Sequence, residues 1–235
     1  MNIWKILKDA LKQIYSSRRL LIYIYTPIVI LLLGLTLLAS LVPDFKVRDI
    51  LKDVAAIGEL PFYSGAISQL GLLMWSAATS LCFFAFFALR KIDSSRKETL
   101  NFLLFAACLS GYLMLDDTYM LHEVFFPNYL TIIPSADKVV ILLLGIAMLL
   151  FLYFNRSEIL RNDYGILFLA LMLFGFSVTL DVIPSYLYEE TYALEKIEYI
   201  LEDGAKFAAI VTWYAFFVQY CYQQFLLLKI SQKPN

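Results

Sequence analysis

The chain has 235 residues, of which 61% are apolar and 17% are charged, and its formal net charge is −1. Soluble domains are about 45–50% apolar, so the composition predicts an integral membrane protein whose main partner is the lipid bilayer. The sequence has no basic stripe of the kind that binds a phosphate backbone, which argues against nucleic-acid binding. A second copy of the chain or another membrane protein remains a candidate partner.

Residues 1–19 predict an amphipathic helix that lies on the cytoplasmic surface of the membrane. Ile3, Leu7 and Leu11 recur at helical spacing, whereas Lys5 and Lys8 lie off that stripe. A helix with one apolar and one basic face binds the anionic inner leaflet of a bilayer.

Six apolar segments follow, at residues 20–42, 66–89, 99–121, 138–154, 164–183 and 205–228. Each approaches the ~20 residues that a helix needs to cross ~30 Å of hydrocarbon. Because backbone groups in lipid must form their hydrogen bonds within the segment, the segments are predicted to be helices. We therefore expect an all-α, polytopic membrane protein: a six-transmembrane-helix bundle over residues 20–228, followed by a cytoplasmic tail at 229–235.

The distribution of basic residues predicts the orientation. Thirteen of the 19 Lys and Arg residues fall in the two termini and in the loops after the second and fourth segments. Such residues stay in the cytoplasm, so we expect a multi-pass protein of the cell (inner) membrane with both termini cytoplasmic. Fifteen of the 20 acids fall on the opposite side, where their field attracts cations.

The third segment ends in a polar stretch. Residues three, four and seven positions apart share a helix face, which predicts one polar stripe made of Tyr112, Asp116, Tyr119 and Glu123. Asp117 and His122 are expected to flank this stripe on opposite sides. Pro127 is expected to end the helix.

Two further segments bring charges to the same outer depth, because odd segments run outward and even ones inward. Asp181 closes the fifth segment. Glu198, Glu202 and Lys206 share one face at the start of the sixth, with Glu202 and Lys206 in a favourable i,i+4 order and Asp203 beside them. We expect Asp116 or Glu123 to pair with Lys206.

Ionisable side chains at membrane depth are costly and therefore indicate a functional site. The candidate ion or proton site consists of Asp116, Asp117, His122, Glu123, Asp181, Glu202, Asp203 and Lys206, supported by Tyr112, Tyr119 and Glu198. Several carboxylates with one histidine and one lysine suit a proton relay or oxygen ligation of a hard cation. The preferred function is therefore cation or proton binding or translocation.

Two alternatives stay open. In the first, the protein is a metal-dependent membrane enzyme that acts on a lipid-like substrate from the outer side, with a divalent metal as cofactor; its candidate ligands are Asp116, His122, Glu123, Glu202 and Asp203. No ExxH or HExxH motif is present, and a single histidine excludes bis-histidine haem and three-histidine zinc sites within one chain. In the second, the protein is a non-catalytic membrane subunit and the cluster is a structural polar network.

Overall fold

The computed structural model describes Trp4, Tyr15 and residues 18–42, 54–61, 63–129, 136–182 and 192–231. Throughout this part of the chain every regular element is helical, which confirms the predicted all-α class. Most of the predicted surface helix at residues 1–19 lies outside the described residues, so that prediction stays open. The chain divides into two compact units, Met1–Ser64 and Gly65–Asn235, which are described separately.

The first unit contains helix α2 (Arg18–Leu41) and the short helix α4 (Val54–Ile57). Helix α2 covers the first apolar segment of the sequence and carries Pro27 inside it, a residue that removes one backbone donor. Within α2, the Thr36 hydroxyl donates a hydrogen bond to the backbone carbonyl of Leu32, one turn earlier, at 2.8 Å.

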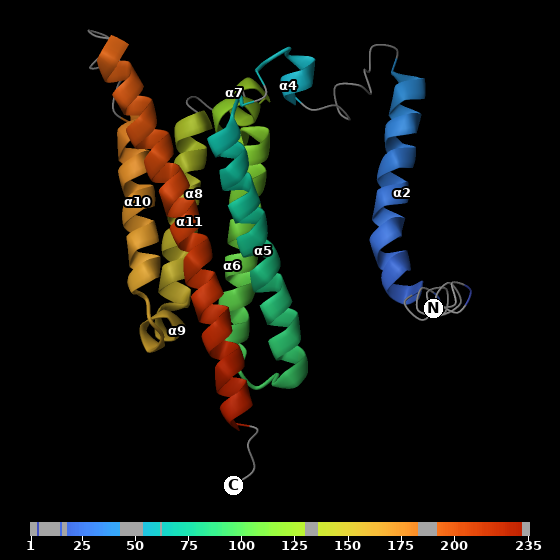
Figure 1. Cartoon of the computed structure of the whole chain (residues 1–235), viewed down its shortest axis with the longest axis vertical. Helices are drawn as coiled ribbons and strands as arrows, with labels where there is room; N and C mark the ends of the chain where they lie inside the picture. The colour runs from blue at the N-terminus through green and yellow to red at the C-terminus, as the bar shows by residue number, and fades with distance from the viewer. Residues whose placement is uncertain are drawn as a thin grey trace. The chain divides into compact units, whose positions relative to one another are not determined.

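The second unit is a bundle of long helices that alternate in direction along the chain (Figure 1). Its elements are α5 (Ala66–Ile92), α6 (Lys97–Tyr119), the π-helix η1 (Leu121–Phe125), α7 (Phe126–Tyr129), α8 (Ala136–Phe154), α9 (Arg156–Arg161), α10 (Gly165–Val182) and α11 (Tyr192–Ser231). Helix α11 packs along α10 and α5, and α5 packs along α6. We call the end where α6 finishes and α11 starts the acidic end. The opposite end, with the α5–α6 turn, α9 and the last turns of α11, is the basic end.

Two element boundaries differ from the sequence prediction. Helix α11 begins at Tyr192 and has 40 residues, although the sixth apolar segment was predicted from residue 205. Hydropathy marks where apolar residues start, whereas this helix begins in the acidic stretch before them. The third segment was expected to stay helical as far as Pro127, but α6 ends at Tyr119.

The buried face of α11 forms the centre of the bundle. Ile210, Trp213, Phe217, Tyr220 and Gln224 follow one another at intervals of three or four residues, and each is 3% exposed or less. This spacing keeps them on one side of the helix. A layer of aromatic rings packs around them, and the rings of α5, α6, α8 and α10 all contribute to it.

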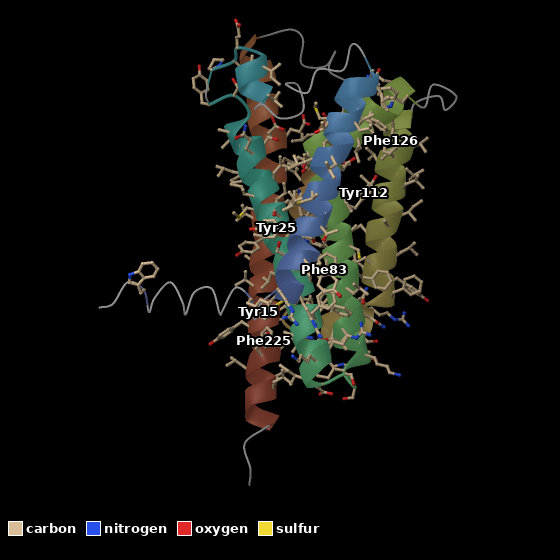
Figure 2. All side chains as sticks on the ribbon, turned by 90° about the vertical axis from the view of Figure 1, so that its right-hand side faces the viewer. Tyr15, Tyr25, Phe83, Tyr112, Phe126 and Phe225 are labelled. Atoms are coloured by element: carbon tan, nitrogen blue, oxygen red, sulfur yellow. The ribbon has the colours of Figure 1, made fainter. Side chains whose placement is uncertain are left out.

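Large apolar side chains also cover much of the outside of the bundle, and Figure 2 shows side chains projecting from the ribbons along their length. Among the described residues, two helices, α5 and α6, are long and apolar enough to cross a membrane, and 33% and 39% of their most apolar stretches are buried. Helices α8 and α10 contain shorter apolar stretches, Lys138–Phe154 and Gly165–Leu180. Exposed apolar surface of this extent is typical of a face that contacts lipid or another protein.

Candidate functional site

The acidic end is shaped by an unusual turn after α6. Met120 has a left-handed backbone conformation, with φ 46° and ψ 49°, which stops the helix. A left-handed residue other than glycine costs about 1–3 kcal/mol. The next turn is π-helical, and the amides of Val124 and Phe125 both donate to the carbonyl of Met120, at 2.8 and 3.1 Å. π-Helical turns are rare in proteins, and many of those that occur lie at functional sites.

This turn folds His122 back onto Asp116. The ring Nδ1 of His122 lies 2.6 Å from Oδ2 of Asp116, and the His122 backbone amide donates to Oδ1 at 3.2 Å. Asp116 is only 2% exposed. The other ring nitrogen, Nε2, lies 3.4 Å from Oε1 of Glu123. The hydrogen bond to Asp116 raises the pKa of His122 above its usual value, although burial acts in the opposite direction.

Asp117 faces a different set of partners. Its Oδ2 accepts a hydrogen bond from Nε1 of Trp75 on α5 at 2.9 Å, and its Oδ1 lies 2.9 Å from Nζ of Lys206 on α11. The expected pairing of Lys206 with Asp116 or Glu123 is therefore wrong. Neighbouring residues on a helix point about 100° apart, so Asp117 reaches α11 while Asp116 turns toward η1.

The predicted stripe from Tyr112 to Glu123 is wrong only for its last member. Tyr112, Asp116 and Tyr119 lie on the continuous helix α6, whereas Glu123 follows the break at Met120. Among the described contacts, neither Tyr112 nor Tyr119 makes a hydrogen bond with the acidic groups, and Tyr119 is 64% exposed. Although Glu123 lies beyond the break, its carboxylate still approaches the ring of His122, the partner of Asp116.

The remaining predicted site residues belong to α10 and α11. Asp203 lies three residues before Lys206. The negative charges of Asp203 and Glu123 both stabilise the ammonium group of Lys206. Glu202 is half-buried one turn before Lys206. Asp181 falls in the last turn of α10 and Glu198 in the first part of α11. The side chains of Asp181 and Glu198 lie outside the described part, so their predicted roles stay predictions.

A metal centre finds no support among the described side chains. In that part of the chain, no group of three His, Cys, Asp or Glu residues comes together in a way that could hold a metal ion. Two of the predicted ligands, Asp116 and His122, are instead bound to each other.

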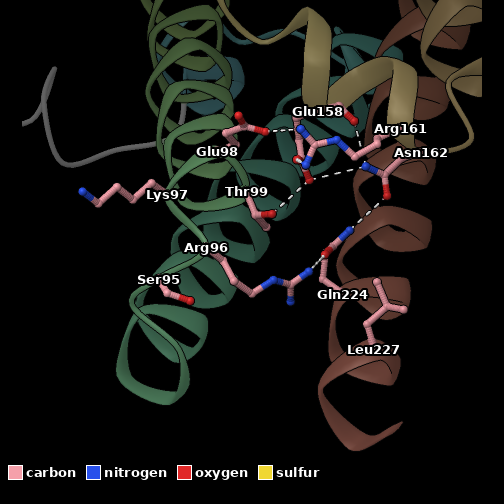
Figure 3. A pocket seen from close by; sticks show the side chains of 10 residues that line it. All are labelled: Ser95, Arg96, Lys97, Glu98, Thr99, Glu158, Arg161, Asn162, Gln224 and Leu227. Carbon is pink, nitrogen blue, oxygen red and sulfur yellow. Dashed lines mark hydrogen bonds and ion pairs between the residues drawn. The ribbon is translucent and has the colours of Figure 1, made fainter. Parts of the chain in front are cut away.

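A second polar cluster, absent from the predicted site, lies at the basic end (Figure 3). Its centre is Glu158 on α9, a carboxylate that is only 4% exposed. Oε1 of Glu158 accepts hydrogen bonds from the hydroxyl of Thr99 on α6, at 3.0 Å, and from the hydroxyl of Tyr220 on α11. The side-chain amide of Asn162, just after α9, donates to the backbone carbonyl of Glu158 at 2.7 Å.

The cluster continues toward the surface through amides and guanidinium groups. Nε2 of Gln224 donates to Oδ1 of Asn162 at 3.1 Å, while Oε1 of Gln224 accepts from Arg96. Arg161 pairs with Glu98, and its other terminal nitrogen lies 3.9 Å from Glu158. A cavity of about 500 Å³ opens among these residues.

One sequence signal pointed to this second cluster. Gln224 follows Trp213, Phe217 and Tyr220 at offsets of 11, 7 and 4 residues, so a polar residue continues an otherwise apolar face. Glu158 gave no such signal, because it lies in the short polar loop between the fourth and fifth apolar segments.

The comparison with protein families covers both clusters. A family described as Domain of unknown function (DUF8692) matches residues 25–220. The chain belongs to this family. The matched range contains Asp116, His122 and Lys206 at the acidic end as well as Glu158 and Tyr220 at the basic end. No curated protein and no solved structure matches the chain.

Proposed function

We propose that this protein is a multi-pass protein of the cell (inner) membrane, with six spanning helices and both termini in the cytoplasm, and that its acidic end binds a proton on His122. The lengths of α5 and α6 and the apolar outer faces of α8 and α10 support the membrane assignment. The excess of Lys and Arg at the basic end and termini supports the orientation. In this orientation the acidic end faces outward.

The observation that carries the proton site is that both ring nitrogens of His122 face carboxylates. Nδ1 lies 2.6 Å from the buried Asp116, and Nε2 lies 3.4 Å from Glu123. A neutral imidazole has one N–H, whereas an imidazolium has two. A protonated ring can therefore donate to Asp116 through Nδ1 while its second N–H lies within ion-pair distance of Glu123.

The charges around the ring favour the same form. Asp116 from α6 and Glu123 from η1 both stabilise the imidazolium, and Lys206 from α11 opposes it. Helix α8 also packs against η1, and Lys138 is its described charged side chain at this end. The hydrogen bond and charge of Asp116, with the charge of Glu123, outweigh the effects of burial and of the ammonium group, so the pKa of His122 is raised.

Binding, rather than translocation, is the function that these contacts favour. Between the two ends, the described side chains on the buried face of α11 are mainly apolar. The indole N–H of Trp213 donates a hydrogen bond to the hydroxyl of Ser110 at 2.9 Å. A proton on His122 instead stabilises the turn at Met120, because it strengthens the hydrogen bond between His122 of η1 and Asp116 of α6. Protonation of the acidic end is thus coupled to the conformation of this turn.

The chain contains a single histidine, so the proton site can be observed directly. We expect the ring ¹⁵N signals of the full-length protein in nanodiscs to titrate with a midpoint above the value of about 6.5 for a free histidine. Asp116→Asn should lower that midpoint, whereas Glu98→Gln at the basic end should leave it unchanged. A midpoint at or below that of free histidine, insensitive to Asp116→Asn, would leave only a structural network.

The orientation has its own test. A fluorescent protein that folds only in the cytoplasm, fused after Asn235, should be bright, and alkaline phosphatase at the same position should be inactive. The opposite pair of results would reverse the topology and place the acidic end in the cytoplasm.

A further inference from the structure

The cavity at the basic end has three walls that come from distant parts of the sequence. The N-cap and first turn of α6 supply Arg96 and Thr99. Helix α9 and the residue after it supply Arg161 and Asn162, and the last part of α11 supplies Gln224. The cavity measures about 500 Å³, which lies within the ~300–1,000 Å³ typical of small-molecule sites.

Arg96 is the wall residue best placed to hold an anion. Its guanidinium carries five N–H donors, and one nitrogen donates to Oε1 of Gln224, a side chain that is almost fully buried. Within the described residues, no carboxylate lies within ion-pair distance of Arg96. The nearby Asp93 is bonded to the amide and hydroxyl of Ser95, at 3.1 and 2.6 Å.

Arg161 forms the opposite wall and can exchange its partner at little cost. Its ion pair with Glu98 is exposed, with the two side chains 63% and 59% accessible. Exposed pairs of this kind contribute about 0–1 kcal/mol. A bound anion can therefore replace Glu98 as the partner of Arg161 without loss of much stability.

The carboxylate inside the cavity does not suit a competing cation. Glu158 lies at the back, where the hydroxyls of Thr99 and Tyr220 both donate to its Oε1 and Arg161 stands 3.9 Å from its Oε2. The acceptor positions of Oε1 are thus already used by groups of the protein, and the charge of Arg161 lies beside Oε2. The positive end of the α6 dipole also faces this region, since Arg96 is the N-cap of α6 and makes no side-chain capping bond.

We propose that this cavity binds the phosphate group of a ligand, between the guanidinium groups of Arg96 and Arg161. Arginine suits this task, because its planar fork binds two phosphate oxygens at once. The volume leaves room for a glycerol-sized group beside the phosphate. Such a group comes from a phospholipid head at the membrane surface or from a soluble phosphate ester, and the chemistry at the two arginines is the same. The proposal is independent of the proton site on His122.

The test uses the full-length protein in dodecyl maltoside, a detergent without phosphate. Two probes are titrated by calorimetry: inorganic phosphate, and dihexanoyl phosphatidylglycerol below its critical micelle concentration. We expect saturable binding of at least one probe. Binding of the lipid alone assigns the site to a phospholipid head, and comparable binding of inorganic phosphate assigns it to a soluble ester. Dihexanoylglycerol, which has the same acyl chains without phosphate, should not bind.

Three variants locate the site. Arg96→Gln and Arg161→Gln should each weaken binding by about tenfold or more, because each removes a charge-assisted hydrogen bond. Lys91→Gln is the matched control, since it removes one positive charge from an exposed residue at the same end but outside the cavity. Its affinity should stay within about twofold of the wild type, as expected for a screened surface charge.

Arg161→Gln is the cavity variant that should still fold normally. The ion pair of Arg161 with Glu98 is exposed, and the substitution leaves the hydrogen bond between Arg96 and Gln224 in place. The proposal fails if neither probe binds saturably to the wild type. It also fails if dihexanoylglycerol binds as tightly as the phospholipid, or if Lys91→Gln weakens binding as much as the two cavity variants.

Discussion

The two ends of the bundle arrange their charges in different ways. At the acidic end, Asp116 and Asp117 each bind their own partners, His122 and Lys206, around a strained turn. At the basic end, one carboxylate, Glu158, collects donors from two other helices. Both clusters touch the same face of α11, where Lys206 and Gln224 are 18 residues or ~27 Å apart.

Burial distinguishes Glu158 at the basic end from Lys206 at the acidic end. Glu158 is 4% exposed, whereas the side chain of Lys206 keeps 38% of its surface accessible. A buried group that loses its partner suffers the full desolvation penalty, while a partly exposed group is rescued by water. The loss of Glu158 should therefore destabilise the fold more than the loss of Lys206.

The largest expected effect is that of Glu158→Leu. The substitution leaves the buried hydroxyls of Thr99 and Tyr220 without their acceptor, at about 1–3 kcal/mol each. Chemical unfolding in detergent should show a loss of about 2–6 kcal/mol. Combining it with Tyr220→Phe should recover part of that loss, since one unsatisfied hydroxyl disappears. A loss below about 1 kcal/mol would mean that water reaches Glu158.

The next effect concerns the acidic end and distinguishes the two neighbouring aspartates. A double-mutant cycle of Asp117→Asn with Lys206→Met should give a coupling energy of about 1–2 kcal/mol, because these groups are 2.9 Å apart and half-buried. The matched cycle of Asp116→Asn with Lys206→Met should give less than half of that. Equal coupling in the two cycles would restore the pairing expected from the sequence.

The sequence predicted the helices well but not the partners within the acidic end. Long apolar segments indicate helices, because a long apolar stretch must pack against protein or lipid and satisfy its own backbone hydrogen bonds. The helices α2, α5, α8 and α10 start and end within a few residues of the predicted ranges. The left-handed turn gave no signal, because position 120 holds Met rather than Gly or Asn. The partners of Asp116 and Asp117 depend on that turn.

The basic end was harder to predict, because its contacts join distant parts of the chain. Thr99 and Tyr220 lie 59 and 62 residues from Glu158 in sequence. Only the packing of α6, α9 and α11 makes Glu158 a buried group, and no local pattern encodes that packing. Gln224 gave the one available hint, as a polar residue on an apolar face.

A smaller effect should depend on pH and be confined to the acidic end. The folded state raises the pKa of His122, so it binds that proton more tightly than the unfolded chain does. This stabilisation is fully present below about pH 6.5 and is lost as pH rises through the raised folded-state value. The melting temperature should fall over that window, and His122→Gln should flatten the fall. An unchanged slope in the variant would show that other groups set the pH dependence.

The smallest effect is expected for the exposed pair at the basic end. Arg161→Gln and Glu98→Gln should each change the free energy of unfolding by less than about 1 kcal/mol, because both side chains lie mainly in solvent and salt screens their attraction. Unfolding at low and high salt measures this term. Arg161 thus lies 3.9 Å from the carboxylate with the largest expected effect, yet contributes little itself. A loss above about 2 kcal/mol for Arg161→Gln would mean that its charge compensates Glu158 directly, which would move Arg161 from the rim of the cavity into the buried network.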